Sequence, residues 1–133
     1  MLKLLLIDDD KINNFLNRSI IEKNCGNECI VSEYTNPEEA YDFLKHSILK
    51  ATENCPDVVF LDINMPEMSG FEFLERMRDE DVVPTHTKIF ILSSSLDPGD
   101  IERSKSFTSV SDFISKPLDK DKIEKIKSLV KSN

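Results

Sequence analysis

The chain has 133 residues, of which 39% are hydrophobic and 32% charged, so it fits one globular domain and is not disordered in composition. Its formal net charge of −8 disfavours non-specific nucleic-acid binding, because an acidic surface repels a phosphate backbone. No apolar run approaches the roughly 20 residues that cross a bilayer, and no signal-peptide cleavage site follows the short apolar N-terminus. We therefore expect one cytoplasmic domain over residues 1–133, with no direct nucleic-acid or membrane partner.

Short apolar segments alternate with longer amphipathic segments along the chain. The first short segment, residues 4–7, is apolar on both faces and stops at acidic residues, which is typical of a buried strand of a parallel sheet. In chain order, we predict strands over residues 4–7, 29–34, 58–61, 88–92 and 112–115.

An amphipathic helix is expected after each strand, and four of the helices begin near a residue suited to capping. Asp10, Asn36, Asp97 and Asp119 can each accept a hydrogen bond from a free N–H of a first turn, and Pro37 fits the first helical position. On the first helix, from Asp10 to about residue 23, the expected apolar stripe is Ile12, Phe15, Leu16, Ser19 and Ile20. Five strands alternating with five helices predict an α/β fold, a parallel sheet with helices on both faces.

The cysteines and histidines give no sign of a site of their own. Cys25, Cys29 and Cys55 are an odd number in a chain expected in the cytosol, and no further Cys or His pair completes a zinc site. We therefore expect free thiols. His46 and His86 are far apart in the sequence, and we expect them on the surface or in loops.

Four of the predicted strands end in residues that carry chemistry. In an open parallel sheet, sites form outside the carboxyl ends of the strands. We therefore expect several carboxylates, a hydroxyl and an ammonium group to gather at one edge of the sheet. The residues are Asp8, Asp9 and Asp10 after the first strand, Asp62 and Asn64 after the third, Ser93–Ser95 after the fourth, and Lys116 after the fifth.

This set of groups suits phosphoryl transfer. Clustered carboxylates repel one another, and oxygen ligands without His or Cys suit a hard cation such as Mg²⁺. A carboxylate can attack a phosphoryl group to give an acyl phosphate, while a lysine and a hydroxyl bind its oxygens. Taken singly, each piece has a simpler interpretation, since acids often cap helices and serine runs often form turns. Their occurrence together at four strand ends favours a phosphoryl-transfer site.

Four stretches closely resemble the receiver domains of two-component response regulators: residues 4–10, 59–70, 91–95 and 113–117. The resemblance covers about residues 2–131. It implies a flavodoxin-like fold, with five parallel strands in the order 2-1-3-4-5 and five helices on both faces.

The resemblance also implies a role for each acidic residue at the strand ends. Asp62 would accept a phosphoryl group from a histidine kinase or a histidine phosphotransfer protein, in a reaction that depends on Mg²⁺. Asp9, Asp62 and the backbone carbonyl of Asn64 would bind the metal ion, and Asp8 would support it. The chain would thus act in phosphorelay signalling and not as an enzyme.

The remaining matched residues would bind the phosphoryl group and read it out. Ser93 and Lys116 would bind it, with a cis peptide bond between Lys116 and Pro117. Ser93 and Phe113 would form the switch and change a protein-binding surface built from the last two helices and the last strand. The downstream partner is not identified by the sequence. Ser69 departs from the family, which commonly has Asp at this position.

Two other functions of the same fold are less well supported by the residues. A phosphatase that works through an aspartyl phosphate carries a second Asp two residues after the nucleophile, where this chain has Asn64, which cannot act as a general acid. A nucleotide- or flavin-binding protein would need a Gly-rich loop after the first strand. The three glycines of the chain, Gly26, Gly70 and Gly99, do not form one.

Overall fold

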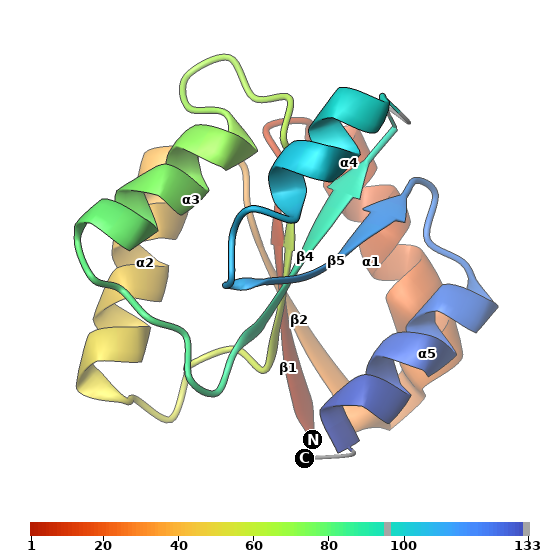
Figure 1. Cartoon of the computed structure of the whole chain (residues 1–133). Helices are drawn as coiled ribbons and strands as arrows, with labels where there is room; N and C mark the ends of the chain where they lie inside the picture. Colours follow the sequence, from red (N-terminus) through yellow and green to blue (C-terminus); the bar gives the residue numbers. More distant parts are fainter. Residues whose placement is uncertain (95–96, 132–133) are drawn as a thin grey trace.

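A computed structural model describes residues 1–94 and 97–131 of the chain. Within these residues, five strands alternate with five α-helices, and a short 3₁₀ turn follows the first helix (Figure 1). In chain order the elements are β1 (Leu2–Ile7), α1 (Lys11–Cys25), η1 (Gly26–Glu28), β2 (Cys29–Tyr34), α2 (Pro37–Lys50), β3 (Val58–Leu61), α3 (Gly70–Asp79), β4 (Lys88–Ser93), α4 (Pro98–Ser104), β5 (Val110–Ser115) and α5 (Lys120–Lys131).

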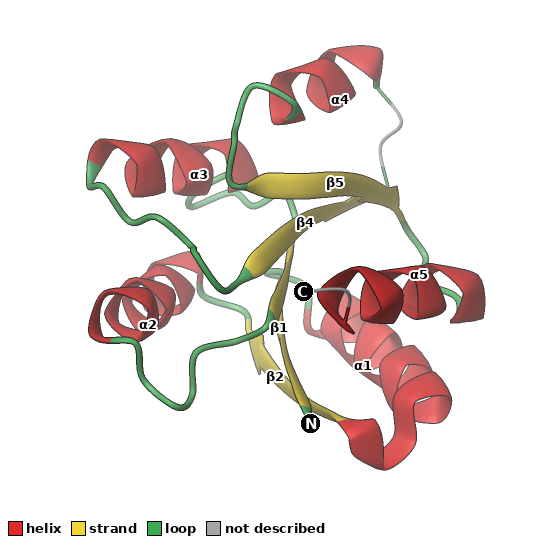
Figure 2. Ribbon diagram, turned by 60° about the horizontal axis from the view of Figure 1, so that its bottom comes forward, coloured by secondary structure: helices red, strands yellow, loops and turns green. Residues whose placement is uncertain are grey.

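The strands form one parallel sheet in the order β2-β1-β3-β4-β5, which confirms the predicted flavodoxin-like topology. Helices α1 and α5 lie on one side of the sheet and α2 and α3 on the other, while α4 lies beside β5 (Figure 2). Because every connection between parallel strands returns through a helix, all carboxyl ends of the strands point to the same edge.

Two hydrophobic cores fill the spaces between the sheet and its helices. Successive side chains of a strand point to opposite faces, so β1 sends Leu5 and Ile7 into the core beneath α2 and α3, and Leu4 and Leu6 into the core beneath α1 and α5. The central strand β3 is buried along its whole length. It therefore gives a rigid base to whatever follows its last residue, Leu61.

The predicted helix caps are confirmed. The Asp10 side chain accepts a hydrogen bond from the Ile12 N–H at 2.9 Å, and Asn36 caps α2 in the same way. Asp97 accepts from the Gly99 N–H at the start of α4, and Asp119 accepts from the Lys122 N–H at the start of α5. Every predicted strand is present, with bounds that differ by two residues at most.

The apolar stripe predicted for α1 is wrong at four of its five residues, whereas the fifth, Ile20, is half-buried against the core beneath α1 and α5. Ile12 is 68% exposed, Phe15 64% and Leu16 51%, and Ser19 is exposed as well. The buried face of α1 consists of Asn14, Asn17, Ile21 and Cys25. The helix is turned this way because the amide of Asn14 donates hydrogen bonds to backbone carbonyls at the strand ends, so a polar residue occupies the position closest to the sheet.

The free thiols predicted for Cys25 and Cys29 are also wrong, because the structure joins them in a disulfide. The η1 turn reverses the chain between α1 and β2 and brings their Cα atoms to 5.8 Å, which is within the usual range for a disulfide. The prediction of free thiols rested on the odd number of cysteines and on the expected cellular compartment, and neither of these reports the distance between two cysteines across a turn. Cys55 is free, as predicted.

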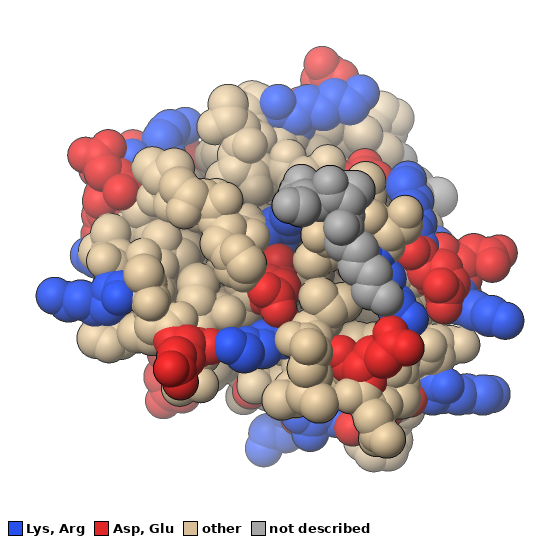
Figure 3. All heavy atoms as spheres, turned by 90° about the horizontal axis from the view of Figure 1, so that it is seen from below, with Lys and Arg blue, Asp and Glu red and all other residues tan. Residues whose placement is uncertain are grey.

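Charges of both signs are mixed on the face of the molecule seen in Figure 3. Where α2 meets α3, opposite charges form a network around Glu80. Its carboxylate accepts hydrogen bonds from the buried Tyr41 hydroxyl at 2.6 Å, from Lys45 Nζ at 2.9 Å and from Arg76 Nε at 3.3 Å. Arg76 also lies over the Tyr41 ring, 4.1 Å from its centre. The hydrogen bonds from Tyr41 and Lys45 lower the pKa of Glu80 to about 2.

A pH-dependent contribution to stability follows from this pKa. Ionised Glu80 stabilises the fold above its ordinary pKa of 4.5, and the contribution is lost as the pH falls from there towards about 2. We expect Glu80→Gln to lower the Tm by a few degrees at pH 7 and by less at pH 3, measured by circular dichroism. Glu22→Gln, on the exposed side of α1, is the control and should change the Tm little at either pH. Equal losses at both pH values for Glu80→Gln would contradict the role of this carboxylate.

Candidate functional site

The candidate site lies at the carboxyl edge of the sheet, where β1 and β3 end side by side. These two strands pair in parallel with Ile7 opposite Leu61, so the residues that follow them, Asp8 and Asp62, emerge next to each other. The pairing continues one step past the strands, since the Asp62 N–H donates to the Ile7 carbonyl at 3.0 Å. The register of two buried strands therefore sets the spacing of two carboxylates.

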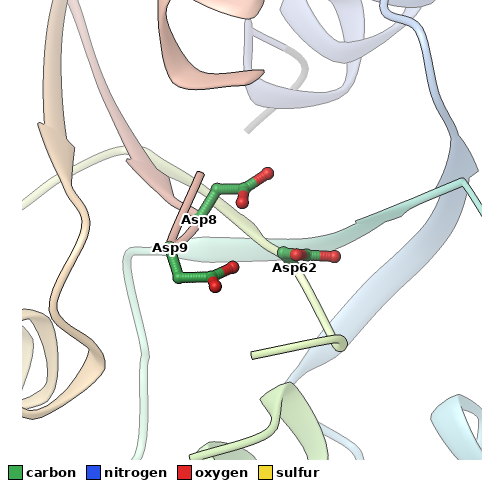
Figure 4. Close-up of side chains that lie close together, drawn as sticks. All are labelled: Asp8, Asp9 and Asp62. Atoms are coloured by element: carbon green, nitrogen blue, oxygen red, sulfur yellow. The ribbon is translucent and has the colours of Figure 1, made fainter. Parts of the chain in front are cut away.

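Three carboxylates gather at this edge (Figure 4). One oxygen each of Asp8, Asp9 and Asp62 lies within 4.8 Å of the others. Asp8 is 4% exposed and Asp62 6% exposed, whereas Asp9 is exposed to solvent. The cluster is thus open on one side, through Asp9, and closed below by the core.

Lys116 reaches the same place from the end of β5. Its Nζ lies 2.8 Å from Asp8 Oδ2 and 3.7 Å from Asp62 Oδ1, and its ammonium group is mostly buried. The Lys116 N–H donates to the carbonyl of Ser93 at 2.8 Å, which ties the end of β5 to the end of β4. The peptide bond between Lys116 and Pro117 is cis.

The loop between β3 and α3 folds back against Asp62. The Asn64 N–H donates to Asp62 Oδ1 at 3.4 Å. A Cβ atom on Gly70 would lie 2.7 Å from the backbone oxygen of Asp62 and 2.8 Å from the Ile63 Cα, so glycine is required there for lack of space. Ser69 begins α3 with a reciprocal capping box to Glu72, so its hydroxyl satisfies a free N–H of the first turn of that helix.

Comparison with known proteins identifies the family. Residues 4–127 match the family profile of the response regulator receiver domain. The chain belongs to this family. The polar-differentiation response regulator DivK of Brucella anthropi is 32% identical over 126 residues, which cover 94% of this chain and 93% of DivK. A crystal structure of a two-component response regulator from Cytophaga hutchinsonii matches with a TM-score of 0.86 and 30% identity, covering 98% of this chain and 97% of that one.

Some relatives are much longer than this receiver. A protein-glutamate methylesterase/protein-glutamine glutaminase of Burkholderia thailandensis is 39% identical over 77 residues, which are 58% of this chain and 19% of that protein. The matched stretch covers only about a fifth of that relative, so the activity in the relative's name describes the relative and not this chain. In this chain, none of the described helices combines the length and the hydropathy that a membrane span requires.

The electrostatics of the receiver's pocket favour a bound cation. Burial raises the pKa of Asp62 to about 6, against the lowering effect of Lys116 and with a further increase from Asp8. The pKa of Asp9 is also raised, by desolvation and then by the neighbouring Asp8. One lysine does not balance three ionised carboxylates, and an oxygen-only donor set suits a hard divalent ion. The residues present therefore fit Mg²⁺.

The geometry gathers four of the predicted site residues: Asp8, Asp9, Asp62 and Lys116. Of the other predicted site residues, Ser93 is fully buried at the end of β4, and Phe113 is half-buried on β5 against the core beneath α2 and α3. The roles assigned to Ser93, Phe113 and the Asn64 carbonyl stay predictions. Ser95, the last of the serine run, lies outside the described residues.

Sequence reasoning missed Asn14. Its side chain is fully buried, and Nδ2 donates to the backbone carbonyls of Asp8 at 3.0 Å and Tyr34 at 3.3 Å. A signal was present in the spacing of Asn14, Asn17 and Ile21, which share one helical face and compete with the more obvious apolar stripe.

The raised pKa of Asp62 predicts that its charge destabilises the metal-free fold. The penalty is absent below its unfolded pKa near 4 and complete above about pH 6. We expect Asp62→Asn to raise the free energy of unfolding at pH 8, without Mg²⁺, by roughly 1–3 kcal/mol, and to change it little at pH 4. Urea unfolding at the two pH values measures this.

Asp10→Asn is the matched control, because it removes an exposed charge nearby while asparagine remains a good helix cap. It should change the free energy of unfolding by much less at pH 8. Added Mg²⁺ should stabilise the parent chain more than Asp62→Asn, since an ion held by the Asp62 carboxylate would bind the folded state alone. An Asp62→Asn variant that is less stable than the parent at pH 8 without metal would contradict the electrostatic account of the pocket.

Proposed function

We propose that this receiver accepts a phosphoryl group on Asp62 from a histidine kinase or a histidine phosphotransfer protein, in a Mg²⁺-dependent reaction. The observation that carries the proposal is the cluster of Asp8, Asp9 and Asp62 within 4.8 Å, with Lys116 Nζ 3.7 Å from Asp62, in a chain of the receiver family. We further propose that residues 1–133 act as one cytoplasmic signalling domain, without substrate turnover and without direct binding to nucleic acid or membranes.

The chemistry would begin with a carboxylate oxygen of Asp62 attacking the phosphorus of a phosphohistidine. The new O–P bond forms as the N–P bond breaks, and the electron pair of that bond leaves on the imidazole nitrogen. Asp9, Asp62 and the Asn64 carbonyl would hold Mg²⁺, with Asp8 in support. Bound there, the ion would neutralise charge on the phosphoryl oxygens.

Lys116 and Ser93 would bind the phosphoryl group once it is on Asp62. Lys116 Nζ now lies closest to Asp8, at 2.8 Å, and would turn to an oxygen of the phosphoryl group on Asp62. The Ser93 hydroxyl would donate to another oxygen, which would pull the end of β4 towards Asp62. Two strand ends would therefore respond to one modification.

Phe113 would carry this change to the surface. It lines a hollow of about 370 Å³ between α4 and β5, together with Ile101, Ser104 and Val110, so space is available beside its ring. Movement of Phe113 would alter the surface of α4, β5 and α5. A protein partner that binds the two shapes with different affinity would read the switch.

The phosphodonor would dock on the exposed face of α1. Ile12, Phe15 and Leu16 lie within two turns of the helix start, directly after the acids of the pocket, and each is more than half exposed. A donor histidine that reaches Asp62 must cover this end of the molecule. Large apolar side chains that nothing in the fold covers suit a protein contact there.

Intact-mass measurement after incubation with acetyl phosphate tests the acceptor. We expect one added phosphoryl group in the presence of Mg²⁺, no addition with EDTA, and no addition to Asp62→Asn. Asp10→Asn, which keeps the helix cap beside the pocket, should be modified like the parent chain. Equal modification of Asp62→Asn, or modification that is independent of Mg²⁺, would contradict the proposal.

The docking face is tested separately with Phe15→Asp. We expect transfer from the cognate histidine phosphodonor to slow by at least about tenfold, since a buried apolar contact is replaced by a charge, while labelling by acetyl phosphate is unchanged. Leu49→Asp is the control, because Leu49 is similarly exposed on α2, away from the pocket. An equal loss in both variants, or none in Phe15→Asp, would exclude this face as the docking surface.

A further inference from the structure

Asn14 makes a pair of hydrogen bonds that no packing requirement explains. Nδ2 donates to the Asp8 carbonyl at 3.0 Å and to the Tyr34 carbonyl at 3.3 Å. These two carbonyls lie just past the end of β1 and at the end of β2, and the Tyr34 carbonyl also accepts from the Asp8 N–H at 3.2 Å. One amide on α1 thus ties together the ends of two strands beside the pocket.

The Asp8 carbonyl belongs to the peptide plane that joins Asp8 to Asp9. A peptide unit is planar, so fixing its oxygen also fixes the direction in which the chain enters Asp9. The Asp8 side chain is held as well, because its Oδ1 accepts from the Asp10 N–H at 2.9 Å and its Oδ2 contacts Lys116 Nζ at 2.8 Å. The bond from Asn14 therefore restrains the backbone between two carboxylates of the cluster.

The oxygen of the Asn14 amide, by contrast, destabilises the fold. Among the described residues, Asn14 Oδ1 is buried and has no hydrogen-bond partner. The small cavity beside the Asn14 side chain, which Asn17 and Asp62 also line, has no room for a water molecule. Turning the amide over would set Oδ1 against two carbonyl oxygens. An apolar side chain would avoid the unpaired acceptor. We therefore attribute the presence of asparagine at this position to the two N–H donors of its amide.

We propose that Asn14 is a positioning residue of the pocket: it holds the Asp8–Asp9 peptide so that both carboxylates face Asp62. Its consequence for Mg²⁺ rests on the proposed function. Without the donors of Asn14, the carbonyl of Asp8 is free to turn, and the three carboxylates no longer share one preformed arrangement. Metal affinity falls because the ion must then order the loop that binds it.

The test compares Mg²⁺ affinity with stability in two variants. Asn14→Leu keeps the branched shape of the side chain and removes both the donors and the unpaired acceptor, whereas Asn14→Ala removes the donors and leaves a cavity. We expect at least a tenfold weaker Kd for Mg²⁺ in both, by isothermal titration calorimetry. Without metal, we expect the Tm to be unchanged or raised in Asn14→Leu and lowered in Asn14→Ala. A merely structural role would make affinity follow Tm.

Asn17→Leu is the matched control, because Asn17 is a buried amide on the same face of α1. In the described part of the chain, no hydrogen bond joins its side chain to the Asp8 or Tyr34 carbonyl. It should bind Mg²⁺ within about twofold of the parent chain. Parent-like affinity in a folded Asn14→Leu, or an equal loss in Asn17→Leu, overturns the proposal.

An NMR measurement separates this proposal from the proposed function. Loss of the bond from Asn14 should move the carbonyl ¹³C resonance of Asp8 upfield in both Asn14 variants and leave it in place in Asn17→Leu. If the parent chain binds no Mg²⁺, the proposed function fails, and this resonance still decides whether Asn14 holds the peptide. An unmoved resonance in the Asn14 variants overturns the positioning role whatever the metal does.

Discussion

The contact between Lys116 and Asp8 is the interaction on which the pocket depends. Three carboxylates lie within 4.8 Å of one another, and the lysine that reaches them comes from the opposite part of the sheet, 108 residues along the chain from Asp8. The contact is mostly buried, so loss of Lys116 would leave the carboxylates of Asp8 and Asp62 against the core without a compensating charge. The order of the strands makes this contact possible, because it places the ends of β1, β3 and β5 around the same pocket.

The fold was predictable because its signals are local. Short apolar segments indicate the strands, of which β1, β3 and β4 are largely buried, and capping side chains such as Asp10 and Asn36 indicate helix starts. The order of the strands was a different matter, since alternation alone predicts a parallel sheet and not its sequence of neighbours. That order came from the resemblance to receivers, and the observed sheet confirms it.

The wrong predictions for α1 and for the cysteines share one cause, which is that a pattern of side chains in the sequence does not report the path and the contacts of the backbone. Helical periodicity assigns apolar residues to the core, yet Asn14 faces the sheet because two carbonyls there accept its hydrogen bonds, and Phe15 is left exposed. Asn14 was overlooked as part of the site for the same reason. The pairing of Cys25 with Cys29 depends on the turn between them, which cysteine counting does not see. The carboxylates were found because their placement follows from strand ends alone.

The most direct test of the pocket is a crystal structure with Mg²⁺ and fluoroberyllate, a mimic of the phosphoryl group. We predict the metal between Asp9 and Asp62, the fluoroberyllate on a carboxylate oxygen of Asp62, and Lys116 Nζ moved from its position 2.8 Å from Asp8 to a fluorine atom. Metal bound away from these carboxylates, or Lys116 still on Asp8 with fluoroberyllate bound to Asp62, would contradict the proposed switch.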